Sequence, residues 1–285
     1  MKIQGTTKLL GVIGYPVEHS LSPVMHNAAI AHLGEDYVYL PLRISPNDLS
    51  TALEGFAAMG VRGFSITIPH KQAIIPLLSE VSTVAQSVGA VNTVWSKPDG
   101  WGGTNTDVVG FIAPLQAYEV DWNSKKVVIL GNGGAARAVV AGCAQLGLGE
   151  IHVVGRNAEK LAQFQTSWLE SPMAVCLKIH LWEELSTLMA ETDLLVNTTP
   201  VGMFPHGDRS PVDERVMDQL RPATIVYDLI YRPSPTQFLK FAELRGAIAI
   251  DGLEMLVQQG AAALEIWLKQ PVPVEVMREA LQQQL

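Results

Sequence analysis

Short apolar runs rich in Val, Ile and Leu alternate with segments of helical period along nearly all 285 residues of the chain. The run at 126–130, KVVIL, is so nearly continuous that both faces of its strand should be buried, as in a parallel sheet. Strict alternation of strands and helices with short connections is typical of a doubly wound sheet. We therefore expect an α/β protein, and a prior of about 150 residues per domain predicts two domains.

The expected elements divide the chain into two halves near residue 107. In the first half we expect strands and helices in turn at 8–14, 23–33, 37–44, 48–59 and 63–68, then short helices at 73–78 and 81–88, a hairpin over 91–104 and a helix at 110–118. In the second half we expect strands, with helices between them, at 126–130, 151–155, 175–179, 194–198, 224–230 and 247–250. The tail should form helices at 253–269 and 274–284, and its period does not say on which half it packs.

Composition and charge exclude several classes of protein. With 48% hydrophobic and 17% charged residues and a mean hydropathy of +0.19, a disordered chain is not expected. The net charge of −8 argues against broad binding to nucleic acid, although it leaves room for a pocket that holds one phosphate. No apolar run approaches the roughly 18 residues of a membrane span, and residues 1–8 lack a signal-peptide pattern. We expect a cytoplasmic monomer or homodimer without a nucleic-acid or membrane partner.

The two cysteines carry no sign of a disulfide scaffold or a metal site. Cys143 and Cys176 each lie among apolar neighbours. Neither has the spacing to a second cysteine or to histidines that metal coordination requires. We therefore expect two buried, inert thiols and no bound metal.

A glycine-rich loop follows the strand at 126–130 and precedes a helix. The segment 131–136, GNGGAA, fits the pattern G-x-G-x-x-A. Gly131 permits the tight turn, Gly133 lets the backbone approach a pyrophosphate, and Ala136 allows close packing of helix on strand. Free N–H groups at the helix N-terminus favour the diphosphate, so the loop predicts a dinucleotide site.

The end of the next strand indicates which nucleotide binds. An NAD site usually has Asp or Glu about 20 residues after the glycine loop, whereas this chain has Gly155, Arg156 and Asn157 there, with Lys160 a turn later. A guanidinium can hold a phosphate through two parallel hydrogen bonds, which favours a 2′-phosphate and hence NADP. The alternative is a solvated arginine at a strand end. Glu159 can complement the dipole at the start of the following helix.

Two serines precede the first helix. Ser22 followed by Pro23 is typical of an ordinary helix N-cap. The hydroxyls of Ser20 and Ser22, next to a helix N-terminus, would equally suit a bound carboxylate. Both interpretations stay open from the sequence.

Further polar residues follow strands of the first half. Thr67 and Lys71 come at the end of the strand at 63–68, and Asp107 lies where the two halves join. A lone lysine is usually solvated, so spacing alone does not make Lys71 catalytic. Paired with a carboxylate such as Asp107, it could handle a proton during reduction of a carbonyl group.

A series of short motifs resembles those of the shikimate dehydrogenases and covers the chain from about residue 9 to its end. These motifs are Ser20-Leu21-Ser22-Pro23, Thr67-x-Pro69-x-Lys71, Gly89-Ala90-Val91-Asn92-Thr93, Asn105-Thr106-Asp107, Gly131-x-Gly133-Gly134-Ala135, the segment 197–203, Tyr227-Asp228-Leu229-Ile230-Tyr231 and Asp251-Gly252-Leu253-x-Met255-Leu256-x-x-Gln259. The resemblance implies reversible, NADPH-dependent reduction of 3-dehydroshikimate to shikimate, a step toward aromatic amino acids. It also implies a substrate-binding α/β domain at 1–107 plus 252–285 and a Rossmann-like NADP domain at 108–251.

The resemblance further implies roles for individual residues. Lys71 and Asp107 would be the catalytic acid–base pair. The substrate would be bound by Ser20, Ser22, Thr67, Lys71, Asn92, Asp107, Tyr231 and Gln259. The cofactor would be bound by Gly131, Asn132, Gly133, Gly134, Ala135, Arg156, Asn157, Lys160, Thr198, Pro200, Met203, Leu229, Gly252 and Met255.

Three other functions compete with this one. An NAD-dependent quinate/shikimate dehydrogenase would share the motifs, but Arg156 and Lys160 without an adjacent acid disfavour NAD. A non-catalytic NADP-binding sensor would not need both Lys71 and Asp107. A methyltransferase also uses a glycine-rich turn between strand and helix, but it has no use for a phosphate-binding arginine.

Overall fold

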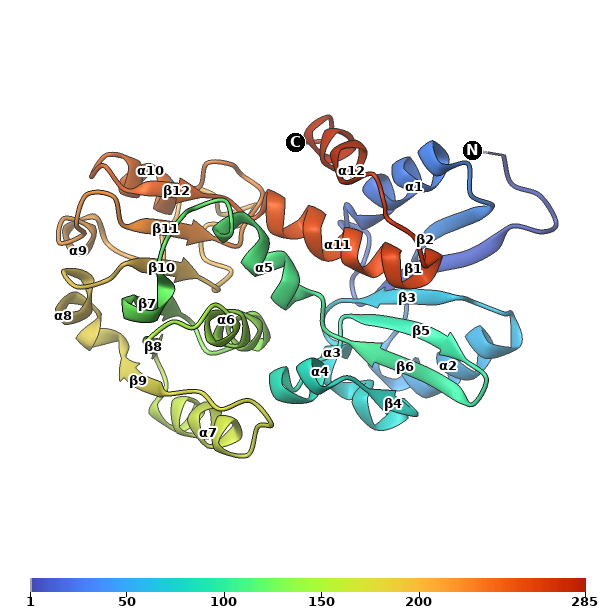
Figure 1. The fold of residues 1–285 in the computed structure, drawn as a ribbon, viewed down its shortest axis with the longest axis horizontal. Coiled ribbons are helices and arrows are strands. Elements are labelled where there is room, and N and C mark those ends of the chain that lie inside the picture. Colours follow the sequence, from blue (N-terminus) through green and yellow to red (C-terminus); the bar gives the residue numbers. More distant parts are fainter. Residues whose placement is uncertain (1) are drawn as a thin grey trace. The chain divides into compact units, whose positions relative to one another are not determined.

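The computed structural model describes residues 2–285, which form two compact units (Figure 1). Unit 1 contains the residues up to Gly110 together with Val257–Leu285, and unit 2 contains Phe111–Leu256. Helices α5 (Asp107–Leu115) and α11 (Leu253–Leu268) contribute residues to both units. Each unit has a six-stranded sheet, so the predicted α/β fold is confirmed.

Unit 1 has a mixed sheet in the strand order β2-β1-β3-β5-β6-β4. β1 is parallel to β2 and β3, whereas β5 is antiparallel to both β3 and β6. The expected hairpin is therefore present, between β3 and the edge strand β4. The strands are β1 (Lys8–Gly14), β2 (Tyr37–Arg43), β3 (Gly63–Ile66), β4 (Glu80–Val81), β5 (Thr93–Lys97) and β6 (Gly100–Thr104).

Helices pack on both faces of this sheet. On one face, Leu53 and Phe56 of α2 pack against Phe64 of β3. On the other face, Trp267 of α11 donates a hydrogen bond from Nε1 to the Val94 carbonyl oxygen at 2.8 Å. The remaining helices of unit 1 are α1 (Ser22–Leu33), η1 (Pro46–Asp48), α2 (Leu49–Ala58), α3 (His70–Ala73), η2 (Ile75–Leu77), α4 (Thr83–Val88) and α12 (Val274–Gln282).

Unit 2 has a fully parallel sheet in the strand order β12-β11-β10-β7-β8-β9. The chain starts in the middle of the sheet at β7, winds outward through β8 and β9, and then continues on the other side of β7 through β10 to β12. This doubly wound order brings the carboxyl ends of β7 and β10, neighbours in the sheet, to one edge. The strands are β7 (Lys126–Leu130), β8 (Glu150–Gly155), β9 (Leu177–Leu181), β10 (Leu194–Asn197), β11 (Ile225–Asp228) and β12 (Ile248–Ile250).

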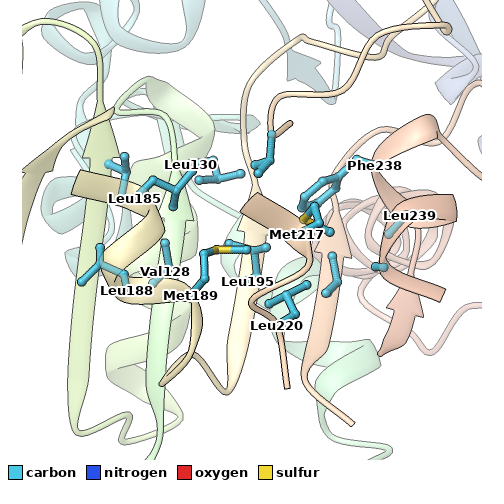
Figure 2. Close-up of a cluster of buried hydrophobic side chains, with 14 residues drawn as sticks. Val128, Leu130, Leu185, Leu188, Met189, Leu195, Met217, Leu220, Phe238 and Leu239 are labelled. Carbon is cyan, nitrogen blue, oxygen red and sulfur yellow. The ribbon is translucent and has the colours of Figure 1, made fainter. Parts of the chain in front are cut away.

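A cluster of buried hydrophobic side chains fills the space between one face of this sheet and three helices (Figure 2). Val128 and Leu195 come from the sheet, Leu188 from α8, Met217 from α9 and Phe238 from α10. The cluster gives the strands a rigid base from which their terminal loops extend. The helices of unit 2 are η3 (Trp122–Ser124), α6 (Gly134–Gln145), α7 (Ala158–Leu169), η4 (Trp182–Glu184), α8 (Leu185–Met189), α9 (Glu214–Met217) and α10 (Gln237–Glu243).

Some local predictions were wrong. The short edge strand β4 (Glu80–Val81) was not predicted, and its Val81 was assigned to a helix. Cys143 is buried as expected, but Cys176 is exposed because it precedes the edge strand β9 rather than lying inside it. Within residues 2–285, every helix is too short or too polar to cross a bilayer.

Candidate active site

Lys71 and Asp107 form a close ion pair in unit 1. Lys71 lies on the single-turn helix α3 just after β3, and Asp107 is the first residue of α5. Lys71 Nζ donates to Asp107 Oδ2 at 2.6 Å, and the two side chains are 29% and 15% exposed. Because the pair is half-buried rather than sealed, a ligand in contact with solvent can reach its ammonium group. The two residues are brought together as the resemblance implied.

The buried side chain of Asn92 joins this ion pair to its surroundings. Its Nδ2 donates to Asp107 Oδ1 at 2.8 Å and to Thr106 Oγ1 at 3.0 Å, and lies 3.5 Å from Gln259 Oε1. Its Oδ1 accepts from the Thr106 backbone N–H at 2.8 Å. Asn92 therefore lies at the centre of a network that contains four of the predicted substrate residues. Asp107 and Gln259 contact Asn92 directly, and Lys71 is joined to it by way of Asp107.

The two buried residues before Asp107 hold its backbone in place. Asn105 Oδ1 accepts from the Asp107 backbone N–H at 3.0 Å, and Asn105 Nδ2 donates to the Ala90 carbonyl oxygen at 3.0 Å. Asn105 and Thr106 are each 3% exposed. Sequence reasoning quoted these residues only as part of a motif. The signal that could have found their role is a run of three polar residues directly after the hairpin strand β6.

Lys71 has an anchored backbone. His70, which precedes it, is fully buried, and its Nε2 donates to the Ile44 carbonyl oxygen at 2.8 Å. The Lys71 carbonyl oxygen accepts from the Val91 backbone N–H at 2.8 Å. The buried His70 thus fixes the helical turn from which the Lys71 side chain extends.

Ser20, Ser22 and Thr67 lie at other places in unit 1. Ser22 is the first residue of α1, and Leu21 occupies the N-cap position with no capping side-chain hydrogen bond. The N-cap interpretation of Ser22 is therefore wrong, because Leu21 already has a near-helical backbone and moves the cap one residue upstream. Ser20 Oγ instead accepts from the Ser22 backbone N–H at 3.3 Å. Both serines and Thr67 are partly exposed, as a ligand would require.

The glycine loop of unit 2 exposes its backbone. Gly131 has φ of 102°, in the left-handed region, and a Cβ there would lie 2.9 Å from Thr198 Oγ1. Gly133 is the N-cap residue of α6 and makes no side-chain cap. A Cβ on Gly133 or Gly134 would meet nothing within 4 Å, so space lies open next to this helix N-terminus. The first N–H groups of a twelve-residue helix therefore suit a diphosphate.

The predicted phosphate pocket follows β8. Asn157 is the N-cap of α7, and its Oδ1 accepts from the Lys160 backbone N–H at 2.9 Å. Glu159 lies in the first turn of this helix, as interpreted from the sequence. The exposed guanidinium of Arg156 lies over the ring of Trp182, 5.1 Å from its centroid. Sequence reasoning did not identify Trp182.

The loops after β10 and β11 are held together by a buried carboxylate. Asp228 is fully buried; its Oδ1 accepts from Asn197 Nδ2 at 2.9 Å and from the Ile230 N–H at 3.1 Å, and its Oδ2 accepts from Thr236 Oγ1 at 2.7 Å. Burial raises the pKa of Asp228 to about 6, although these hydrogen bonds oppose the shift. These hydrogen bonds hold in place the backbone on either side of Leu229.

The remaining predicted residues of unit 2 lie on loops or a helix start near these strand ends. Thr198 Oγ1 donates to the Leu130 carbonyl oxygen at 2.7 Å, which ties its loop to the end of β7. Gly252 approaches the β11 loop so closely that a Cβ would lie 2.1 Å from the Leu229 carbonyl oxygen. Burial raises the pKa of Tyr231. The other three are Pro200 and Met203, which are exposed, and Met255, which is partly buried in the first turn of α11.

Within residues 2–285, His, Cys, Asp and Glu side chains form no group of three or more that could hold a metal ion. The polar groups described above are organised around hydrogen bonds and one ion pair. The arrangement in unit 1 supplies a proton donor, and that in unit 2 supplies backbone N–H groups and a guanidinium.

Known proteins share this fold and sequence along the whole chain. Family models described as shikimate dehydrogenase substrate binding domain and shikimate 5′-dehydrogenase C-terminal domain match residues 12–94 and 252–282. A shikimate dehydrogenase (NADP(+)) of Crocosphaera subtropica is 62% identical over 283 residues, which cover 99% of this chain and 98% of that protein.

Solved structures agree. A crystal structure of shikimate dehydrogenase in complex with NADP+ is 37% identical, with a TM-score of 0.90, and the match covers 99% of this chain and 97% of that one. Quinate dehydrogenase from Corynebacterium glutamicum in complex with NAD is 30% identical, with a TM-score of 0.89 over 97% of this chain and 99% of that one. The resemblance of the motifs is confirmed, and the chain belongs to the shikimate dehydrogenase family.

Proposed function

We propose that this chain is an NADP-dependent shikimate dehydrogenase, which interconverts 3-dehydroshikimate and shikimate. The observation that carries the proposal is the Lys71–Asp107 ion pair, held at 2.6 Å and joined through Asn92 to Gln259. The name of the 62% identical relative, which aligns over nearly the whole of both chains, supports the same activity and the same cofactor.

Lys71 is the proposed acid of the reduction. Bound NADPH supplies a hydride to the ketone carbon, and the negative charge then develops on the ketone oxygen. The Lys71 ammonium donates a proton to that oxygen, and in shikimate oxidation the neutral amine takes the proton back. Asp107 accepts a hydrogen bond from Lys71, which orients the ammonium.

Neutral polar side chains and the Asp107 carboxylate orient the substrate in this proposal. Ser20 and Ser22 bind its carboxylate at the start of α1. The ring hydroxyls bind to Thr67, Asn92, Asp107 and Gln259, and Tyr231 reaches toward the substrate. The amide of Asn92 is already held by three hydrogen bonds to Thr106 and Asp107, so little reorganisation is needed when the substrate arrives.

The cofactor is proposed to bind unit 2. The N–H groups of the segment 131–135 hold the diphosphate at the start of α6. Arg156, with Asn157 and Lys160, holds the 2′-phosphate, and the loops bearing Thr198, Pro200, Met203 and Leu229 border the nicotinamide together with Gly252 and Met255. We further propose that residues 1–107 plus 252–285 form the substrate domain and 108–251 the NADP domain.

A dehydrogenase for quinate with NAD is the second candidate, because the chain also shares its fold and 30% of its sequence with a quinate dehydrogenase in complex with NAD. A spectrophotometric assay of NADP⁺ and NAD⁺ reduction, with shikimate and with quinate, separates the two. We expect shikimate with NADP⁺ to give the highest kcat/KM of the four combinations. Preference for quinate and NAD⁺ would favour the second candidate, and no reduction in any combination would favour a sensor.

A further inference from the structure

The contact between Arg156 and Trp182 suggests a role for a residue outside the motifs named above. We propose that Trp182 is a specificity-determining residue that favours NADP over NAD by positioning the guanidinium of Arg156. The inference rests on the proposed function, in which Arg156 binds the 2′-phosphate. Trp182 itself does not touch that phosphate in this proposal and acts through the arginine.

The register of two neighbouring strands brings the two residues together. β8 and β9 run parallel, and Gly155 at the end of β8 is opposite Leu181 at the end of β9. Arg156 and Trp182 are the next residues of the two chain segments. They therefore leave the sheet side by side, with the Arg156 guanidinium 5.1 Å from the centroid of the Trp182 ring.

Trp182 is the fixed member of this contact. It begins the turn η4, which is closed by a hydrogen bond from the Leu181 backbone N–H to Glu184 Oε2 at 2.7 Å. Its side chain is partly buried and packs against the hydrophobic cluster of Figure 2. An indole anchored in this way presents a rigid aromatic face.

Arg156 is the solvent-facing member of the contact. Its side chain is exposed, and no carboxylate of residues 2–285 forms an ion pair with it. A free arginine loses rotamer entropy when it binds a ligand, which weakens binding. A guanidinium held over the Trp182 ring by cation–π attraction has fewer rotamers to lose, and its N–H groups can still donate to a phosphate.

This arrangement affects the two nucleotides differently. A 2′-phosphate gains from a guanidinium that is already in position, because less entropy is lost on binding. The 2′-hydroxyl of NAD has no charge for the guanidinium to bind, so it gains little. The contact should therefore raise the preference for NADP without changing the chemical step.

The test compares two replacements of Trp182. Trp182→Leu keeps an apolar side chain against the hydrophobic cluster but removes the aromatic face, whereas Trp182→Phe keeps a smaller aromatic face. We expect Trp182→Leu to raise the KM for NADP⁺ about threefold to fivefold, the scale of one exposed cation–π contact, with kcat and the KM for NAD⁺ unchanged. Trp182→Phe should retain most of the preference. Calorimetric titration measures binding without turnover: Trp182→Leu should weaken the binding of 2′,5′-ADP and leave that of 5′-AMP unchanged.

Three results would overturn the proposal: an equal rise in KM for both nucleotides, no change for either, or the same loss in Trp182→Phe as in Trp182→Leu. Circular dichroism checks that the variants fold. If Trp182→Leu does not fold, Trp182→Met serves as the non-aromatic replacement and carries the same expectation.

A double variant separates failure of this proposal from failure of the proposed function. In an Arg156→Ala background, Trp182→Leu should have no further effect on the KM for NADP⁺. An undiminished effect there would show that Trp182 does not act through the arginine. If the unaltered protein itself shows no preference for NADP⁺, or Arg156→Ala leaves that preference intact, the proposed function of Arg156 fails first.

Discussion

The two units differ in the atoms that they offer to a ligand. In unit 1 the proposed site consists of side chains bonded to one another, with Asn92 between Asp107 and Gln259. In unit 2 the loop at 131–135 offers mainly backbone N–H groups next to open space. Proton transfer needs one particular functional group held in place, whereas a diphosphate needs only donors. A single side chain should therefore matter more in unit 1 than in the loop of unit 2.

The topologies of the two sheets explain this difference. The antiparallel hairpin of β5 and β6 brings Asn92, just before one strand, next to Thr106, just after the other. Polar residues distant in sequence thus face each other across a strand pair. The parallel strands of unit 2 all end at one edge, where loops and helix N-termini gather.

The largest effect is expected from Lys71→Ala. Removing the proposed acid should lower kcat by roughly 10² to 10⁴-fold, the scale of general acid–base catalysis, with KM for shikimate nearly kept. Steady-state kinetics measure both quantities. Lys97→Ala is the matched control, because Lys97 also pairs with a carboxylate, Glu80, in unit 1. Near-normal turnover in Lys71→Ala would contradict the assigned role.

The second-largest effect is expected on stability, from the buried Asp228 carboxylate that joins the loops of unit 2. Burial raises the pKa of Asp228 to about 6 from 3.8, the ordinary value for an aspartate, so the folded protein holds this proton more tightly than the unfolded chain. The protonated Asp228 carboxyl therefore makes its full contribution to the free energy of unfolding below about pH 4. This contribution falls by roughly 3 kcal/mol in total as the pH rises to about 6.

Asp228→Asn removes this titration while it keeps the size of the side chain. The difference in unfolding free energy, unaltered protein minus variant, should fall by roughly 3 kcal/mol between about pH 4 and pH 6. Urea denaturation at several pH values measures it. Parallel stability profiles for the two proteins would show that Asp228 does not titrate in this range.

The third effect concerns the choice of nucleotide. Arg156→Ala should raise the KM for NADP⁺ about 10- to 100-fold, the value of charge-assisted hydrogen bonds, and leave the KM for NAD⁺ nearly unchanged. Arg221→Ala is the control, because Arg221 is also an exposed arginine of unit 2 but precedes β11 and pairs with Asp193. Equal loss with both nucleotides would mean that Arg156 is structural.

The smallest effect is expected from Ser22→Ala. Loss of one hydroxyl from the proposed carboxylate site should raise the KM for shikimate about fivefold and leave the melting temperature unchanged, because Ser22 does not cap α1. Ser82→Ala provides the contrast: Ser82 Oγ caps α4 by accepting from the Ala85 N–H, so stability should fall by about 1 kcal/mol without a change in KM. A drop in stability alone for Ser22→Ala would contradict the substrate role.

The central strands were predictable because their residues are apolar on both faces. The expected strands at 8–14 and 126–130 are observed as β1 (Lys8–Gly14) and β7 (Lys126–Leu130). The edge strand β9 (Leu177–Leu181) begins two residues later than expected. Its half-exposed side chains give no apolar run that marks its ends, and the same lack of pattern led to the wrong expectation for Cys176.

Contacts between residues distant in sequence were not predictable without the fold. The motifs named Asn92 and Asp107, but only the hairpin register shows that Asn92 bonds to the carboxylate. Trp182 meets Arg156 through the register of β8 and β9, which no spacing along the chain reveals. His152 and His180 approach to 2.9 Å across the same strand pair, although neither gave a signal in the sequence.

Proton transfer is assigned to unit 1 and nucleotide choice to unit 2. The most direct test of this assignment is the ratio of kcat/KM for NADP⁺ to kcat/KM for NAD⁺, with shikimate as substrate. It is compared in the unaltered protein, Lys71→Ala and Arg156→Ala. We predict that Lys71→Ala lowers both values together and keeps the ratio, whereas Arg156→Ala lowers the ratio at least tenfold with kcat kept. A ratio that changes in Lys71→Ala, or that stays the same in Arg156→Ala, would contradict the account.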